Sequence, residues 1–151
     1  MAGLVKKALA LPWLLAVFLA VDRLAKFFSL KKLPLEGVSL IPGWLNFSLY
    51  RNSYIAFGWH LPEPLLLGLI IIILFGLGWL FIRAYQHQDF GLAFWLGLVI
   101  VGALSNLIDR LIYGQVIDFI EVPGWSVFNF ADIFIIAGLL GWLVRKVKIK
   151  N

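Results

Sequence analysis

Four apolar stretches divide this 151-residue chain, and each is roughly as long as a helix that crosses a lipid bilayer. At about 1.5 Å per residue, a helix needs about 20 residues to cross about 30 Å of hydrocarbon. The stretches cover residues 9–28, 65–82, 90–108 and 131–147. The fourth is apolar only as far as Val144, so it spans only if Arg145 and Lys146 extend toward the lipid headgroups. We predict a mainly α-helical membrane protein with four transmembrane helices.

The composition supports this fold class and excludes several kinds of catalytic and binding site. Only 14% of the residues are charged, whereas soluble domains contain about 25%. The chain has no cysteine and no threonine, which excludes proteases with a cysteine or threonine nucleophile. His60 and His87 form no zinc-protease motif. We therefore predict no metal and no cofactor. The basic residues gather at the chain ends without an aromatic and basic surface between them, so we predict no nucleic-acid partner.

Four crossings would place both termini on the same side of the membrane. That side would carry seven Lys or Arg residues against six on the other, and the dense basic cluster at residues 145–150 favours cytoplasmic termini. Lys6 and Lys7 precede the first stretch as in a signal peptide, but no small-x-small cleavage site follows, so we predict that this span is retained. Pro12 is expected in the opening turn of the first helix, where its missing N–H costs little.

Two segments on the non-cytoplasmic side carry hairpin signals. Residues 29–63 contain two runs of alternating polarity around Pro42-Gly43, with aromatic residues suited to a small sheet at the membrane interface. Residues 109–130, the predicted catalytic loop region, contain a second Pro-Gly at positions 123 and 124. We predict one β-hairpin in each segment.

The second hairpin predicts that two carboxylates meet at one membrane face. If a two-residue turn joins Val122 to Trp125, Asp118 lies opposite Asn129, and Asp132 follows within three residues. Carboxylates at the margin of the hydrocarbon layer are costly, which favours a functional role. A close pair in which one acid is ionised and the other protonated can activate water and polarise a carbonyl. Asp118 and Asp132 are therefore our candidate catalytic pair.

Other polar residues are expected near the same face. Asn106, Asp109 and Arg110 share one helical face at the end of the third stretch. Arg110 could pair with Asp109, or its guanidinium could hold a carbonyl or a phosphate-like group. Asp22 and Lys26, four residues apart in the first helix, predict an ion pair. For Asp109 and Arg110 a scaffold role and a site role fit equally well, whereas for Asp22 and Lys26 a structural ion pair is favoured over substrate contact.

Two asparagines extend this set. Asn52 and Asn129 could hydrogen-bond a substrate backbone or orient a carboxylate. Asn129 is also well suited to cap the fourth helix, and Asp132 to occupy its first turn.

These motifs together resemble the lipoprotein signal peptidases, also called signal peptidase II. Five blocks in the family's order carry the resemblance: residues 22–26 (DRLAK), 51–58 (RNSYIAFG), 102–110 (GALSNLIDR), 114–119 (GQVIDF) and 128–132 (FNFAD). The family implies a membrane aspartyl endopeptidase that cleaves signal peptides just before a diacylglyceryl-modified cysteine. By this resemblance, the catalytic pair falls on Asp118 and Asp132.

The resemblance also sets expectations for location and partners. It implies a multi-pass protein of the bacterial inner membrane, with the active site near the outer, periplasmic face. Expected partners are lipid-modified prolipoproteins and membrane lipids, with the chain acting as a monomer in one domain, residues 1–151. Tyr54 and Ser105 stand where the family usually has glycine, and the first change is expected to affect the segment that covers the substrate.

Two other function classes fit the same carboxylates. A small transporter or proton relay would need ionisable groups near the middle of the bilayer. An assembly factor would use the polar residues only to hold helices together. Here the polar residues fall near the ends of the apolar stretches, which favours the peptidase.

Overall fold

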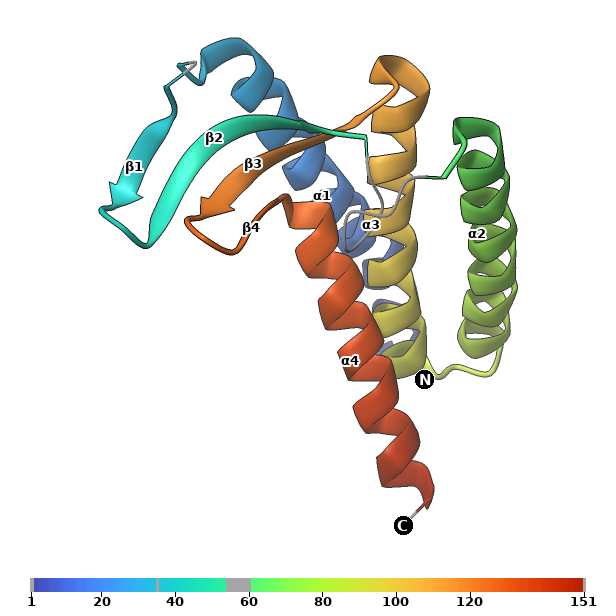
Figure 1. Ribbon diagram of the computed structural model, residues 1–151. Helices are drawn as coiled ribbons and strands as arrows, with labels where there is room; N and C mark the ends of the chain where they lie inside the picture. Colours follow the sequence, from blue (N-terminus) through green and yellow to red (C-terminus); the bar gives the residue numbers. More distant parts are fainter. Residues whose placement is uncertain (1, 35, 54–60, 151) are drawn as a thin grey trace.

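The computed structural model describes residues 2–34, 36–53 and 61–150, and it consists of a helical bundle with a small sheet at one end (Figure 1). Along the chain the elements are α1 (Ala2–Lys32), β1 (Val38–Ile41), β2 (Leu45–Asn52), α2 (Glu63–Gln86), α3 (Phe90–Tyr113), β3 (Val116–Val122), β4 (Ser126–Phe128) and α4 (Phe130–Lys150). The predicted order of helices and hairpins is therefore confirmed.

Three helices in the described ranges are long and apolar enough to cross a membrane: Ala8–Lys32, Glu63–Gln86 and Phe90–Tyr113. This result confirms three of the four predicted spans, and α4, whose 21 residues include Asp132, Arg145 and Lys146, is not among them. The helices extend beyond the predicted apolar limits, because polar residues at the membrane boundary can continue a helix. Pro12 consequently lies inside α1, not in its opening turn. Its missing N–H is tolerated in membrane helices, where neighbouring groups satisfy the freed carbonyl.

Helix α3 forms the centre of the bundle, and α1, α2 and α4 all pack against it (Figure 1). Buried side chains such as Leu15, Ala93 and Leu96 form the apolar core between these helices. Glycine permits the closest approach between α3 and α4. A Cβ added at Gly102 would lie 2.4 Å from the carbonyl oxygen of Ala131. The first turn of α4 is thereby brought directly against α3.

The four strands form one antiparallel sheet in the order β1-β2-β3-β4. Each hairpin turns at a Pro-Gly pair, where the glycine has a positive φ of 78° at Gly43 and 76° at Gly124. The amide of Trp44 bonds to the carbonyl of Ile41 at 2.9 Å, as expected for a type II turn with proline and then glycine. Pairing of β2 with β3 joins the two predicted hairpins into one sheet.

The predicted register of the second hairpin is wrong by one residue. Val122 pairs with Ser126, and Ile120 pairs with Phe128, so residues 123–125 form the turn. The amide of Trp125 closes this longer turn on the carbonyl of Val122, at 3.0 Å. Asn129 therefore lies beyond the end of β4 and not opposite Asp118 in the ladder.

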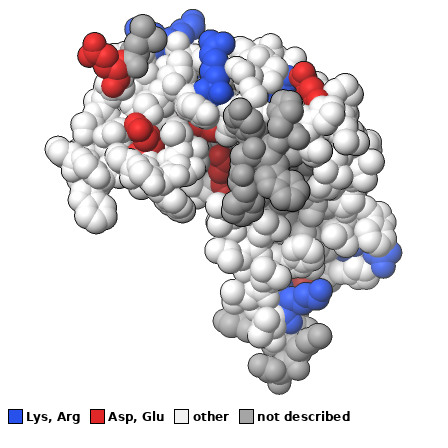
Figure 2. Space-filling view, viewed as in Figure 1, with Lys and Arg blue, Asp and Glu red and all other residues white. Residues whose placement is uncertain are grey.

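The two ends of the bundle differ in character. The sheet lies at one end, and both termini lie toward the other (Figure 1). Figure 2 shows basic side chains near the two ends and an uncharged surface on the helices between them. This distribution is expected for helices surrounded by lipid, because charged side chains are costly within the hydrocarbon layer.

Candidate active site

The end of the bundle next to the sheet gathers all nine predicted site residues. Three helices, the sheet and the residue before α4 contribute them: Asp22 and Lys26 (α1), Asn52 (β2), Asn106, Asp109 and Arg110 (α3), Asp118 (β3), Asn129, and Asp132 (α4). Figure 2 shows acidic atoms in the hollow between the sheet and the helices. Sequence positions more than 100 residues apart thus share one polar cluster.

Asp118 is almost completely enclosed, with an exposed fraction of 1%. Its Oδ1 accepts a hydrogen bond from Asn129 Nδ2 at 2.6 Å, and its Oδ2 accepts one from Asn52 Nδ2 at 3.0 Å. The pKa of Asp118 is raised from 3.8 to about 7, mainly by burial and also by the nearby charge of Asp132, while the hydrogen bonds from Asn52 and Asn129 offset part of the increase. A carboxyl group with a pKa near neutrality can exchange a proton during a reaction.

Asp132 lies in the first turn of α4 and is held by a reciprocal cap. The backbone amide of Asp132 donates to Asn129 Oδ1 at 3.0 Å, and the backbone amide of Asn129 donates to Asp132 Oδ2 at 3.2 Å. The predicted capping role of Asn129 is therefore confirmed. The other carboxylate oxygen of Asp132 accepts a hydrogen bond from Asn106 Nδ2 at 2.8 Å.

Two asparagines connect the carboxylates to each other. Asn129 Nδ2 lies 2.6 Å from Asp118 Oδ1 and 3.2 Å from Asn106 Oδ1, while Asn106 Nδ2 donates to Asp132. The sequence prediction that Asp118 and Asn129 meet is thus correct for their side chains, although their strand register is not. Each of these two amide groups is hydrogen-bonded through both its oxygen and its nitrogen, so neither can rotate without losing bonds. They therefore fix the positions of the two acids relative to one another.

Lys26 forms the base of this cluster, with an exposed fraction of 1%. Its Nζ lies 3.0 Å from Asp22 Oδ2 and 2.8 Å from Asp109 Oδ2, and it donates to Asn106 Oδ1 at 2.8 Å. The predicted ion pair of Asp22 with Lys26 is confirmed. Because Lys26 donates to the amide oxygen of Asn106, the amide nitrogen of Asn106 is left to face Asp132.

Asp109 pairs with α1 and not mainly with its neighbour Arg110. Its carboxylate forms ion pairs with Arg23 and Lys26, and it also accepts a hydrogen bond from the backbone amide of Ile117 at 3.2 Å. The proposed pairing of Asp109 with Arg110 is thus corrected, because α1 lies beside this face of α3. Sequence reasoning missed Arg23. Its adjacency to Asp22 in an apolar helix was the available signal.

Asp22 ties the start of α4 to the rest of the bundle. Its Oδ1 accepts a hydrogen bond from the backbone amide of Ala131 at 2.9 Å, and its Oδ2 accepts one from Ser105 Oγ at 2.5 Å. Ser105, predicted as a tolerated change from glycine, therefore has its hydroxyl engaged in the buried network. Asp22 fixes the first turn of α4 and so indirectly positions Asp132.

Arg110 lies beside a cavity of about 300 Å³ at the same end of the bundle. The other residues that line the cavity are Ser53, Leu61, Glu63, Leu66, Gly114 and Gln115. Because Glu63 shares this lining with Arg110, the cavity carries charges of both signs. A cationic fork between the carboxylates and a cavity can bind a peptide carbonyl there. Tyr54 lies outside the described residues.

The raised pKa of Asp118 predicts a pH-dependent stability. Below pH 3.8 Asp118 is protonated in both the folded and the unfolded chain, so its burial is then least costly. As pH rises from 3.8, the unfolded chain ionises at Asp118 while the folded protein keeps it protonated, so stability is lost until the pH passes about 7 and changes little above that. We expect the unfolding midpoint of the parent protein to fall more steeply across this range, between pH 3.8 and about 7, than that of Asp118→Asn.

A matched substitution on the same strand controls this measurement. Glu121 lies on β3 and its carboxylate is only partly buried, so Glu121→Gln should follow the parent protein's pH dependence. Parallel curves for the parent protein and Asp118→Asn in detergent would contradict the assignment of the raised pKa.

The chain is similar to a family of known proteins. The family model described as signal peptidase (SPase) II matches residues 14–148. The lipoprotein signal peptidase of Chlorobaculum parvum is 41% identical over 140 residues, covering 81% of this chain and 85% of that protein. That of Syntrophomonas wolfei is 41% identical over 133 residues and covers 83% of each chain.

The fold is also similar to solved structures. A bacterial membrane enzyme structure determined in meso at 2.3 Å resolution has a TM-score of 0.80, covering 100% of this chain and 91% of that one at 22% identity. This likeness concerns the fold alone. Together with the matched family model and the 41% identical relatives, the polar cluster leads to one conclusion. The chain belongs to the signal peptidase II family.

Proposed function

We propose that Asp118 and Asp132 are the catalytic pair with which this membrane lipoprotein signal peptidase hydrolyses its substrates. The observation that carries the proposal is the convergence of the two acids. They come from β3 and the first turn of α4, are bridged by Asn129 and Asn106, and interact electrostatically. The substrates that we propose are diacylglyceryl-modified prolipoproteins, cleaved just before the lipidated cysteine.

The pair can hydrolyse a peptide bond without a covalent intermediate on the enzyme. Two close carboxylates do not both ionise easily, so they share one proton near neutral pH. The ionised acid takes a proton from water as the water oxygen attacks the scissile carbonyl carbon. The protonated acid donates to the carbonyl oxygen, and a proton then passes to the leaving nitrogen as the C–N bond breaks. The two acids exchange roles during the cycle.

Neighbouring groups provide positioning and charge. The Asn52 amide donates to Asp118 and lies at the end of β2, where an extended substrate segment could run beside the sheet. Arg110 stands at the cavity of about 300 Å³ and interacts with both acids. We propose that Arg110 binds a substrate carbonyl next to the scissile bond, where its planar guanidinium provides directed donors.

We further propose how the single domain sits in its membrane. Helix α4 forms the fourth span, both termini are cytoplasmic, and the catalytic end faces the periplasm. The sheet then rests at the outer interface. In support of an interfacial position for the sheet, Trp44 and Trp125 are 75% and 80% exposed on the two Pro-Gly turns at its free end. Exposed tryptophans of this kind settle at the headgroup level.

A cleavage assay with a defined substrate tests the proposed function. The purified protein in detergent should cleave a diacylglyceryl-modified prolipoprotein, and mass spectrometry should locate the new N-terminus at the lipidated cysteine. The same prolipoprotein without the diacylglyceryl group should be cleaved much more slowly, since acyl burial would position the scissile bond. Cleavage elsewhere, or equal rates for the two substrates, would contradict the proposal. Proton flux into liposomes without any cleavage would instead support the alternative function, a small transporter or proton relay.

A further inference from the structure

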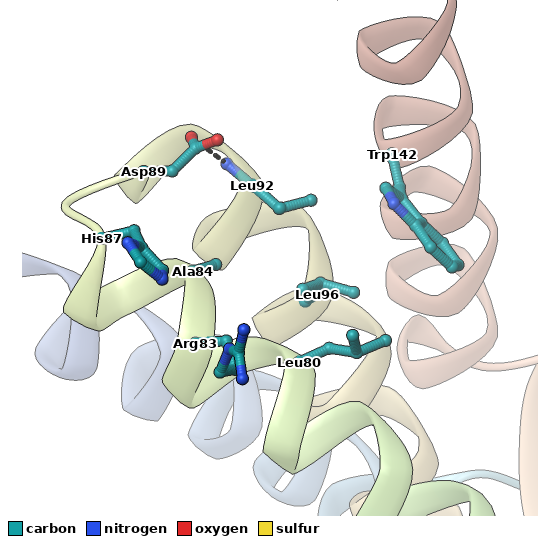
Figure 3. A pocket seen from close by; sticks show the side chains of 8 residues that line it. All are labelled: Leu80, Arg83, Ala84, His87, Asp89, Leu92, Leu96 and Trp142. Atoms are coloured by element: carbon teal, nitrogen blue, oxygen red, sulfur yellow. Dashed lines mark hydrogen bonds between the residues drawn. The ribbon is translucent and has the colours of Figure 1, made fainter.

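A second cavity, of about 230 Å³, lies between the helices at the end opposite the acidic cluster. Figure 3 shows Leu80, Arg83 and Ala84 on α2, Leu92 and Leu96 on α3, and Trp142 on α4 facing a common space. The two remaining lining residues, His87 and Asp89, belong to the connection from α2 to α3. We call this space the α2–α4 groove. Five of its eight lining residues are apolar, and its polar residues all lie at one end.

The acidic residue at this end is already engaged. Asp89 Oδ1 accepts a hydrogen bond from the amide of Leu92 at 3.0 Å and forms an ion pair with Arg145 Nη2 at 2.6 Å. Arg145 is packed closely there, since a Cβ added at Gly91 would lie 2.6 Å from its Nη1. The negative charge of Asp89 is therefore compensated within the protein.

The cationic residue of the lining is Arg83, in the last turn of α2. Its guanidinium carbon lies 5.1 Å from the centre of the Trp79 ring, one turn back along the helix. With Asp89 paired to Arg145, Arg83 gives the lining of the groove a positive charge beside its apolar residues. Lys146 adds a further exposed cation in the last turns of α4.

We propose that the α2–α4 groove binds one anionic glycerophospholipid, with an acyl chain between α2 and α4 and the phosphate at Arg83. The match is one of charge and polarity. Basic residues at the ends of membrane helices attract anionic headgroups, and the apolar interior suits hydrocarbon. The volume is below the roughly 300–1,000 Å³ of pockets that enclose a whole small ligand. It therefore accommodates part of one chain and leaves the rest of the lipid in the bilayer.

This lipid would act as a structural component of the bundle. Helices α2 and α4 both pack on α3, and the groove lies between them. An acyl chain against Leu80, Leu96 and Trp142 would replace missing side-chain contacts across this space. The proposal does not depend on the catalytic assignment, because the groove and the acid pair lie at opposite ends of the molecule.

Native mass spectrometry of the intact chain tests the proposal with two probes, phosphatidylglycerol and phosphatidylcholine with identical acyl chains. We expect the parent protein to retain one phosphatidylglycerol and to prefer it over phosphatidylcholine. Arg83→Gln should reduce this preference about fivefold, as expected for one basic residue at an anionic lipid. Lys6→Gln is the matched control. Lys6 is exposed in the first turns of α1, at the same end of the bundle but outside the groove, so its loss should change the preference less than twofold.

Two results would overturn the proposal. One is equal retention of the two lipids by the parent protein, which would show ordinary hydrocarbon contact without headgroup recognition. The other is an equal loss of preference in Arg83→Gln and Lys6→Gln, which would show only general charge attraction. Phosphatidylglycerol should also raise the unfolding midpoint of the parent protein and of Asp118→Asn, and should raise that of Arg83→Gln less. Because Asp118→Asn tests lipid binding in an inactive protein, a failure of this proposal is distinguishable from a failure of the catalytic one.

Discussion

Asp118→Asn and Asp132→Asn are each expected to lower the rate of prolipoprotein cleavage by roughly 10²–10⁴-fold while the protein still folds. An amide has nearly the shape of the carboxyl group, but it cannot take a proton from water or pass one to the carbonyl oxygen. The double substitution should be little worse than either single one, since the two acids act as one unit. Cleavage rates of the purified variants, measured with the diacylglyceryl substrate, check this result.

Two controls separate lost chemistry from lost structure. Glu121→Gln removes a carboxylate from the same strand as Asp118 at a position paired with Asn46, away from Asp132, and should retain normal cleavage. The unfolding midpoints of the two aspartate variants at pH 5 should stay near that of the parent protein. Normal turnover by either aspartate variant would falsify the catalytic pair.

Lys26→Met is expected to destabilise the folded protein by about 3–5 kcal/mol, which is the usual cost of removing one member of a buried ion pair. Methionine fills nearly the same volume but leaves the carboxylates of Asp22 and Asp109 without their shared cation. It also removes the donor that orients Asn106, so cleavage should fall together with stability. Denaturant or thermal unfolding in detergent, alongside the cleavage assay, measures the two effects.

The same substitution at an exposed lysine of α1 provides the comparison. Lys31 lies five residues beyond Lys26 near the end of α1, where its side chain is exposed and its ammonium group contacts the ring of Phe27. Lys31→Met should change stability by less than about 1 kcal/mol. If the two variants proved equally stable, Lys26 would not hold the network as the contacts indicate.

The local features of the fold could be predicted from sequence because each depends on near neighbours. The Pro-Gly turns, the cap at Asn129 and the Asp22–Lys26 pair all follow from residues within a few positions of one another. The membrane helices follow from apolar length. The ends of these helices could be predicted less well, since a helix continues past the hydrocarbon boundary wherever polar residues can be solvated.

The non-local contacts could not be predicted in the same way. Helical periodicity shows that Asp109 faces other helices, but not that α1 supplies Arg23 to that face. Alternation of polarity identifies each hairpin, yet the pairing of Tyr50 with Asp118 depends on how the helices bring β2 beside β3. The one-residue error in the second turn arose because Pro-Gly fits turns of two lengths equally well.

The wide separation of the site residues along the chain has a consequence for biosynthesis. The contacts of Asp132 require Asn106, and those of Asn106 require Lys26, so segments from the first helix to the last must already be in place. A ribosome-bound chain emerging from its N-terminus lacks α4 until the end of translation. If Asp118 and Asp132 form the catalytic pair, the site can therefore assemble only after α4 has been synthesised and packed against α3.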